Sequence, residues 1–141
     1  MGIFLNSTAP FEAYKITALD KYFVDKTMLI EELIPSIRRE QRFLCITRPR
    51  RFGKTVMANM VASYFGKAID SSFVFEHLAI AKSPVYEEYI NKYDVIYIDF
   101  SRLPENCQTY EEYINRIKTG IKEDLFEEFP ELELKEEMSL W

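Results

Sequence analysis

The hydrophobic residues of the chain follow two patterns, continuous runs and helical spacing. Residues 43–46 and 95–98 are apolar without polar alternation, which is typical of strands that are covered on both faces of a parallel sheet. In residues 56–65 and 110–125 the apolar positions instead lie one helical turn apart. The order strand, helix, strand, helix predicts an α/β layered domain with right-handed crossovers.

Weaker patterns lie before the first run. Residues 1–20 are mixed and are expected to form a loop. Residues 22–24 are aromatic and β-branched, so we expect a short extended segment there, followed by Asp25 as the cap of a helix that begins near Lys26. Pro35 should kink or end this helix.

Between and after the runs, two more helices are expected. The Ser-Pro pair at 83–84 predicts a helix that runs to about Lys92, with the proline in its first position. Residues 102–108 are expected to form a loop, and Thr109 can cap the long helix that follows. Beyond Pro130 the sequence is mostly acidic.

The composition fits one globular domain. The chain has 141 residues, of which 48% are hydrophobic and 29% charged, and a chain of this length can bury a continuous core. The formal charge of −5 argues against a general binder of nucleic acids or anionic membranes, because such proteins carry a broad positive field. Any anion site should therefore be local.

The cysteines and the apolar runs indicate a cytoplasmic protein. Cys45 and Cys107 fit no metal-ligand spacing, and Cys45 lies in an apolar run where we expect it in the core. His77 has no partner at ligand spacing and is interpreted as structural. No run of about 18 apolar residues could span a membrane, and no signal peptide is evident.

A candidate phosphate-binding loop lies between the first run and the helix after it. Gly53, Lys54 and Thr55 match the end of the pattern G-x-x-x-x-G-K-[ST]. Gly53 would let the backbone approach a phosphate, while amides at the helix N-terminus bind its oxygens. Lys54 would contact the β- and γ-phosphates of ATP, and the Thr55 hydroxyl would hold Mg²⁺.

Two other interpretations of this segment remain open. Gly-Lys-Thr also occurs in basic turns before ordinary helices, and Arg48 stands where the pattern has its first glycine. Arg48, Arg50 and Arg51 could also form a nucleic-acid patch, but because their surroundings are not basic we expect them to serve the anion.

Three stretches resemble the bacterial AAA-ATPase-like family of P-loop proteins. They are Tyr-Phe-Val-Asp-Lys-Thr at 22–27, Ile-Thr-Arg-Pro-Arg-Arg-Phe-Gly-Lys-Thr at 46–55 and Val-Ile-Tyr-Ile-Asp-Phe-Ser at 95–101. Their order and spacing match the family across nearly the whole chain, and the Arg-Pro-Arg-Arg-Phe-Gly-Lys-Thr form is specific to it. The arginine at position 48 is then a family feature.

The resemblance implies a partial P-loop NTPase domain, with a three-layer αβα architecture and a mostly parallel sheet, that binds ATP and Mg²⁺. Full-length members often continue into a nuclease-like domain. Members also carry a later apolar strand that ends in Asp-Glu, and none occurs before Trp141. Residues 1–141 are therefore expected to be the N-terminal part of the ATPase domain, truncated before the acidic Mg²⁺-binding strand. The expected nucleotide-binding residues are Arg48, Pro49, Arg50, Arg51, Phe52, Gly53, Lys54 and Thr55.

Other candidate residues each have an alternative interpretation, and for Asp99 the alternative is favoured. Phe23 and Val24 are candidate adenine contacts, because related ATPases line the base pocket with such a segment, but they could equally be core residues. Asp99 follows the second run and could position Mg²⁺ next to Thr55, or it could support a neighbouring loop.

Three functions remain in competition. The first is ATP binding through the variant phosphate loop. The second is an active ATPase or kinase that uses Asp99, although no catalytic residue is identified and hydrolysis by this chain alone is not expected. The third is a degenerate or truncated interaction module that keeps the fold. Two or three strands would leave an apolar sheet edge, so self-association or contact with a missing C-terminal part is expected.

Overall fold

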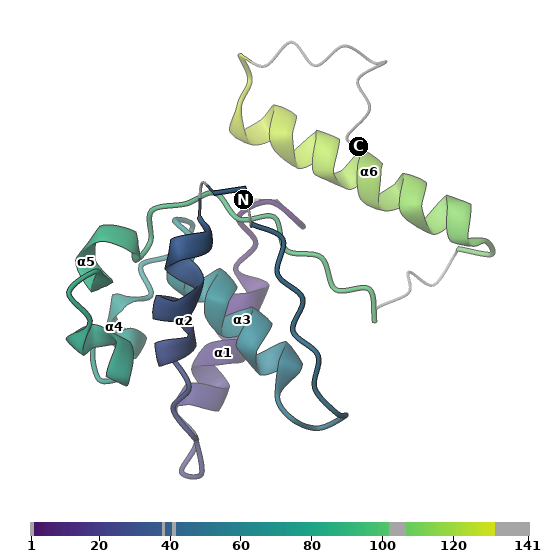
Figure 1. Cartoon of the computed structure of the whole chain (residues 1–141). Coiled ribbons are helices and arrows are strands. Elements are labelled where there is room, and N and C mark those ends of the chain that lie inside the picture. Colours follow the sequence, from purple (N-terminus) through teal and green to yellow (C-terminus); the bar gives the residue numbers. More distant parts are fainter. Residues whose placement is uncertain (1, 38, 41, 102–106, 132–141) are drawn as a thin grey trace. The chain divides into compact units, whose positions relative to one another are not determined.

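The computed structural model describes residues 2–37, 39, 40, 42–101 and 107–131, and in these residues every regular element is a helix (Figure 1). The helices are α1 (Ala9–Ala18), α2 (Met28–Leu33), the 3-10 helix η1 (Ile34–Ser36), α3 (Lys54–Phe65), α4 (Ser72–Phe75), the 3-10 helix η2 (Ala79–Lys82), α5 (Tyr86–Tyr89) and α6 (Tyr110–Glu128). None of the helices in this part of the chain has the length and apolarity that crossing a membrane requires.

The chain divides into two compact units. The central unit is Thr8–Tyr93 and contains α1 to α5. The terminal unit combines Met1–Ser7 with Asp94–Trp141 and contains α6. The candidate phosphate loop belongs to the central unit, whereas Asp99 belongs to the terminal unit.

The expected three-layer α/β fold with a mostly parallel sheet is wrong for this structure. The described residues contain no strand, only two isolated bridges, Leu5 with Ile96 and Gly66 with Tyr93. The first apolar run is exposed, with fractions of 86% for Phe43, 56% for Leu44 and 43% for Ile46. Cys45, expected in the core, is exposed as well. An apolar run becomes a covered strand only where neighbouring strands pair with its backbone, and the described residues give this run no such neighbour.

The second apolar run pairs with the N-terminal segment instead of a parallel strand. The Asn6 amide donates to the Val95 carbonyl at 2.9 Å, and the Tyr97 amide donates to the Phe4 carbonyl at 2.9 Å. The Leu5–Ile96 bridge between them is antiparallel. This run is therefore a single segment tied to the start of the chain.

An aromatic core holds the central unit together. Helix α1 packs along α3, and the Tyr14 ring of α1 stacks on Phe75 with 5.3 Å between the ring centroids. Tyr64 of α3 meets the same Phe75 ring edge-on at 5.4 Å. Tyr14, Tyr64, Phe75, Ile30 and Ile80 are fully buried. Edge-on and stacked ring pairs add to the free energy gained by burial.

Helix α1 was not predicted from the sequence, since residues 1–20 were expected to be a loop. Pro10 stands at the start of the helix, where its fixed φ and missing amide cost nothing. Phe11 and Tyr14 are buried on one face three residues apart. This short spacing was the available signal, but the residues around it showed no longer period.

The predictions for the later helices are largely confirmed. Pro35 ends α2, which passes directly into the 3-10 turn η1. Thr109 caps α6, and its hydroxyl oxygen accepts a hydrogen bond from the Glu112 amide at 3.2 Å. The helix expected at 83–92 is shorter, because α5 covers only Tyr86–Tyr89, and Pro84 lies before the helix instead of in its first position.

Asp124 of α6 organises the terminal unit. Its carboxylate is buried and accepts hydrogen bonds from three consecutive amides, those of Ile3 at 3.1 Å, Phe4 at 2.6 Å and Leu5 at 2.9 Å. Hydrogen bonds to a charged acceptor are stronger than neutral ones. The apolar side of α6 is formed by Tyr113, Ile117 and Ile121, with Phe4 and Ile98 packed against it.

Candidate functional site

The turn before α3 contains two residues in the left-handed backbone region. Arg51 has a φ of 68° and Gly53 a φ of 77°. Glycine adopts this conformation readily, whereas a residue with a Cβ pays a cost of about 1–2 kcal/mol. The Gly53 carbonyl accepts the first α-helical hydrogen bond of α3, from the Met57 amide at 2.9 Å. The helix therefore begins at Lys54, where the phosphate motif ends.

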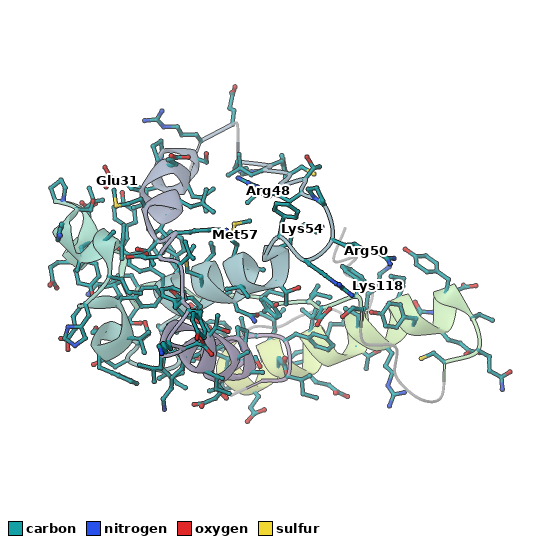
Figure 2. The ribbon with its side chains drawn as sticks, turned by 90° about the horizontal axis from the view of Figure 1, so that it is seen from below. Glu31, Arg48, Arg50, Lys54, Met57 and Lys118 are labelled. Atoms are coloured by element: carbon teal, nitrogen blue, oxygen red, sulfur yellow. The ribbon has the colours of Figure 1, made fainter. Side chains whose placement is uncertain are left out.

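The Lys54 side chain folds back over the loop. Its Nζ donates to the Arg48 carbonyl at 2.5 Å and to the Pro49 carbonyl at 3.3 Å. Figure 2 shows Arg48, Arg50 and Lys54 around the turn that precedes α3. Their side chains and that of Thr55 are exposed, so the cationic groups of the loop are open to an anion from solvent.

The N-terminus of α3 adds positive potential to this loop. The first amides of a helix have no carbonyl partner within the helix, and Gly53, at the N-cap, has no side chain to accept from them. The aligned peptide dipoles place a partial positive charge at the same end. Anionic ligands are favoured at such a position.

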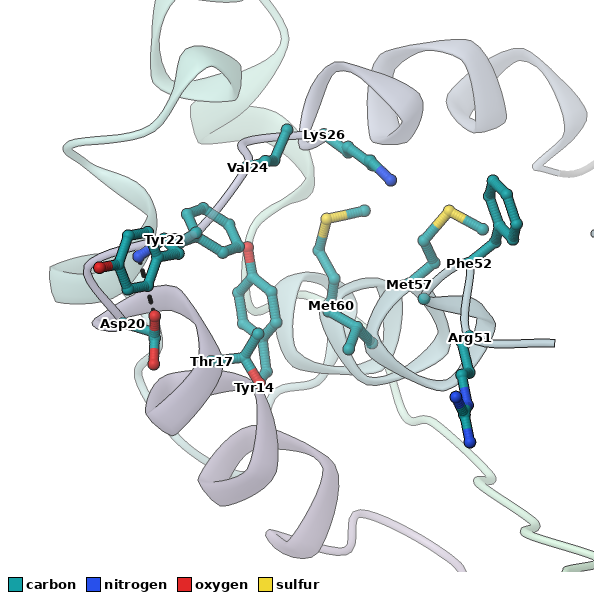
Figure 3. A pocket seen from close by; sticks show the side chains of 13 residues that line it. Tyr14, Thr17, Asp20, Tyr22, Val24, Lys26, Arg51, Phe52, Met57 and Met60 are labelled. Atoms are coloured by element: carbon teal, nitrogen blue, oxygen red, sulfur yellow. Dashed lines mark hydrogen bonds between the residues drawn. The ribbon is translucent and has the colours of Figure 1, made fainter.

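A cavity of about 350 Å³ opens next to the loop. Figure 3 shows that its walls come from α1, the segment after α1, the turn before α3 and the first half of α3. Its lining residues are Tyr14, Thr17, Asp20, Tyr22, Phe23, Val24, Lys26, Arg51, Phe52, Gly53, Val56, Met57 and Met60. Pockets for small molecules are usually apolar with a few polar groups, and this lining has that character.

One wall of the cavity, residues 22–26, is fastened at both ends. At its start, the Asp20 carboxylate accepts a hydrogen bond from the Tyr22 amide at 2.8 Å. At its end, the Asp25 carboxylate accepts from the Thr27 amide at 2.8 Å and from the Thr27 hydroxyl at 2.7 Å. The expected role of Asp25 as a helix cap is wrong: the N-cap of α2 is Thr27, no side chain caps the helix, and Asp25 instead closes the turn that precedes Met28.

Asp25 and Thr27 also join this wall to η2. The second Asp25 oxygen accepts from the Ala79 amide at 2.7 Å, and Thr27 Oγ1 accepts from the Ile80 amide at 3.1 Å. We call this set of hydrogen bonds the Asp25–Thr27 clip. Burial alone would raise the pKa of Asp25, but the hydrogen bonds from Thr27 and Ala79 outweigh it and hold the pKa below its ordinary value.

Tyr14 forms the inner part of the cavity wall. It is fully buried, and its hydroxyl has no hydrogen-bond partner among the described residues. Burial raises the pKa of this hydroxyl, and the negative charge of Asp25 raises it further. The hydroxyl therefore stays protonated at neutral pH.

The cavity brings together only some of the residues expected in the site. Phe23 and Val24, the candidate adenine contacts, share it with Arg51, Phe52 and Gly53. The other loop residues, Arg48, Pro49, Arg50, Lys54 and Thr55, do not line it. Phe23 is half-buried, whereas Val24 is 68% exposed, so these residues are not simply core.

Asp99 and His77 have local partners. The Asp99 carboxylate, in the terminal unit, accepts from the Ser101 amide at 2.9 Å and from the Ser101 hydroxyl at 2.6 Å. The His77 side chain is 78% exposed and lies 3.1 Å from the Glu76 carboxylate. His77 is thus a surface residue of the central unit.

Sequence reasoning missed Tyr14, Lys26, Met57 and Met60 as residues of the cavity. The two methionines belong to the apolar pattern at 56–65 that predicts α3, and such a pattern does not distinguish core from pocket. Lys26 stands inside the stretch 22–27 that carried the family resemblance, which was the available signal.

Comparison with protein families identifies a match. A family model described as "Predicted AAA-ATPase" matches residues 10–139. Searches among curated proteins and among solved structures return no match. Since the model covers nearly all of the sequence, including the loop and the cavity, the chain belongs to the AAA-ATPase-like family.

Proposed function

We propose that the chain binds ATP with Mg²⁺, with the base in the cavity and the phosphates on the loop before α3. The observation that carries this proposal is that one cavity is lined by Phe23 and Val24 and also by residues 51–53. The candidate base contacts therefore meet the end of the phosphate loop at one opening. A volume of about 350 Å³ lies within the range of small-molecule pockets.

Lys54 supplies the charge for the β- and γ-phosphates. Its ammonium is already held over the loop by the carbonyls of Arg48 and Pro49. A phosphate oxygen is a stronger acceptor than a neutral carbonyl because the hydrogen bond is charge-assisted. ATP would therefore draw the ammonium from the carbonyls without a large movement of the loop.

Thr55 fits the role of a Mg²⁺ ligand. Mg²⁺ in nucleotide sites keeps several waters and takes only one or two protein ligands together with phosphate oxygens. The described residues contain no group of three or more His, Cys, Asp or Glu side chains that could hold a metal without phosphates. The exposed hydroxyl in the first turn of α3 is sufficient for such a site, and Asp99 as a further metal contact stays a prediction.

A fluorescent ATP analogue titrated against wild type and Lys54→Ala tests this proposal. Loss of a charge-assisted hydrogen bond should weaken binding roughly 10- to 100-fold. Lys82→Ala is the matched control, because Lys82 is exposed in the same unit but does not line the cavity. Equal affinities of wild type and Lys54→Ala would refute the proposal. Phosphate release by the same proteins shows whether bound ATP is also hydrolysed.

A second candidate function is a protein-interaction module. It is favoured by the exposed apolar run, in which Phe43, Leu44 and Ile46 face solvent, because contiguous exposed apolar surface marks interaction sites. Self-association through this run should be concentration-dependent in sedimentation velocity and should decrease in Phe43→Ser. A monomer at every concentration would exclude self-association.

A further inference from the structure

Lys26 is a charged residue of the cavity to which the proposed function gives no role. It follows Phe23 and Val24 on the wall formed by residues 22–26 and lines the same cavity. Figure 3 shows its side chain on the wall that faces Met57 and Met60.

The Asp25–Thr27 clip explains why Lys26 points into the cavity. The side chains of the two neighbouring residues are hydrogen-bonded to η2. Asp25 accepts from the Ala79 amide and Thr27 from the Ile80 amide. The backbone around Lys26 is thereby fixed with its neighbours directed away from the cavity. The lysine side chain is left on the opposite side.

The charge of Lys26 is not neutralised within the protein. Among the described residues it has no ion-pair partner, and its side chain is exposed. The one carboxylate in the cavity lining, that of Asp20, is engaged by the Tyr22 amide at 2.8 Å. Lys26 therefore presents a free ammonium group above an apolar floor.

We propose that Lys26 binds the α-phosphate of the nucleotide and makes the site select nucleotides over nucleosides. The inference rests on the proposed function, in which Phe23 and Val24 contact the base and Lys54 contacts the β- and γ-phosphates. The part of ATP between these two ends is the ribose and the α-phosphate, and only the α-phosphate is anionic. An ammonium group next to the base wall matches that group in charge and in order along the ligand.

Competition binding of adenosine, AMP, ADP and ATP to Lys26→Met and Lys26→Arg tests this assignment. Lys26→Met should weaken the binding of AMP, ADP and ATP by one common factor of about 10 or more and leave the affinity for adenosine unchanged. Lys26→Arg keeps the charge and should stay within a few-fold of wild type. Lys82→Met controls for the loss of one positive charge, and thermal unfolding shows whether each variant is folded.

The outcomes separate this inference from the proposed function. If wild type binds ATP in a Lys54-dependent way but Lys26→Met retains full affinity, the inference fails alone. If Lys26→Met weakens the binding of adenosine as much as that of AMP, Lys26 shapes the base pocket and the proposed contact with the α-phosphate is wrong. If wild type binds no nucleotide, or if Lys54→Ala binds ATP as tightly as wild type, both proposals fail.

Discussion

The ammonium group of Lys54 donates a hydrogen bond to the carbonyl of Arg48, six residues earlier, at 2.5 Å. The loop before α3 is thus closed by the same side chain that is proposed to bind the phosphates. A ligand that takes this ammonium group also changes what holds the loop.

Limited proteolysis should detect whether the Lys54 side chain holds the loop closed. In Lys54→Met the loop loses its cross-connection, so trypsin should cut after Arg50 and Arg51 faster than in wild type. ATP should slow these cuts in wild type and have no effect in the variant, because the variant lacks the phosphate contact. Mass spectrometry identifies the cut sites, and cleavage after Lys82 is the internal reference. Equal loop cleavage rates in both proteins would contradict the closing role.

Gly53 should be required for two separable reasons, its backbone conformation and the access that it gives to phosphate. A Cβ at Gly53 would meet nothing within 4 Å, but its φ is 77°, so Gly53→Ala should cost about 1–2 kcal/mol of stability from strain alone. Asparagine tolerates left-handed φ better, so Gly53→Asn should recover much of the stability. Both variants should still bind ATP poorly, since either side chain stands where the phosphate approaches. Normal ATP binding by Gly53→Asn would show that only the backbone conformation matters.

The Asp25–Thr27 clip should make stability depend on pH. The pKa of Asp25 is lower in the folded chain than its ordinary value of 3.8. The ionised carboxylate therefore stabilises the fold above about pH 4, and this contribution is lost as the pH falls through the lower, folded pKa. Asp25→Asn should unfold at a lower temperature than wild type at pH 6, and the difference should shrink towards pH 3. Asp20→Asn serves as the control at the other end of the same wall. A difference between wild type and Asp25→Asn that does not change with pH would contradict this role.

Two buried tyrosines should respond differently to loss of the hydroxyl group. The Tyr64 hydroxyl donates to the Tyr86 carbonyl at 3.0 Å, so Tyr64→Phe should lower the free energy of unfolding by about 1 kcal/mol. The Tyr14 hydroxyl has no hydrogen-bond partner in the described part of the chain, so Tyr14→Phe should be neutral or stabilising, because it removes a buried polar group that makes no bond. Chemical denaturation measures both effects. Destabilisation of similar size in the two variants would mean that the Tyr14 hydroxyl is satisfied in solution.

The helices with long patterns could be predicted from sequence. The spacing at 56–65 and 110–125 indicated α3 and α6, and Thr109 marked the start of α6 because its hydroxyl can accept from an amide of the first turn. Helix α1 has ten residues and a short buried face, so its pattern was too brief to separate from a loop.

The prediction of a sheet is wrong for a different reason. The sequence of residues 43–46 records that these side chains are apolar, but not whether other backbones lie beside them. Pairing is a property of two segments, whereas a pattern describes one. In the described residues the run has no strand beside it, and its side chains are exposed.

The sequence predicts the part of the candidate site that is formed by consecutive residues. The glycine, the lysine and the helix that follows are consecutive, so their arrangement follows from the backbone. The cavity required distant contacts, since Tyr14 and Phe23 come from elements well before Met57 and Met60. Nor could the clip be predicted, because the amides of Ala79 and Ile80 reach Asp25 and Thr27 across more than fifty residues.

Asn6 joins the two points at which the chain leaves and re-enters the terminal unit. Its backbone amide donates to the Val95 carbonyl at 2.9 Å, and its side-chain amide donates to the Asp94 carboxylate at 2.6 Å. The whole of Thr8–Tyr93 therefore leaves and re-enters the terminal unit at adjacent points, in the manner of a domain inserted into a host. We therefore expect that a short linker between residues 7 and 94 could replace this insert, and that residues 8 and 93 are suitable ends to join in a circular permutation.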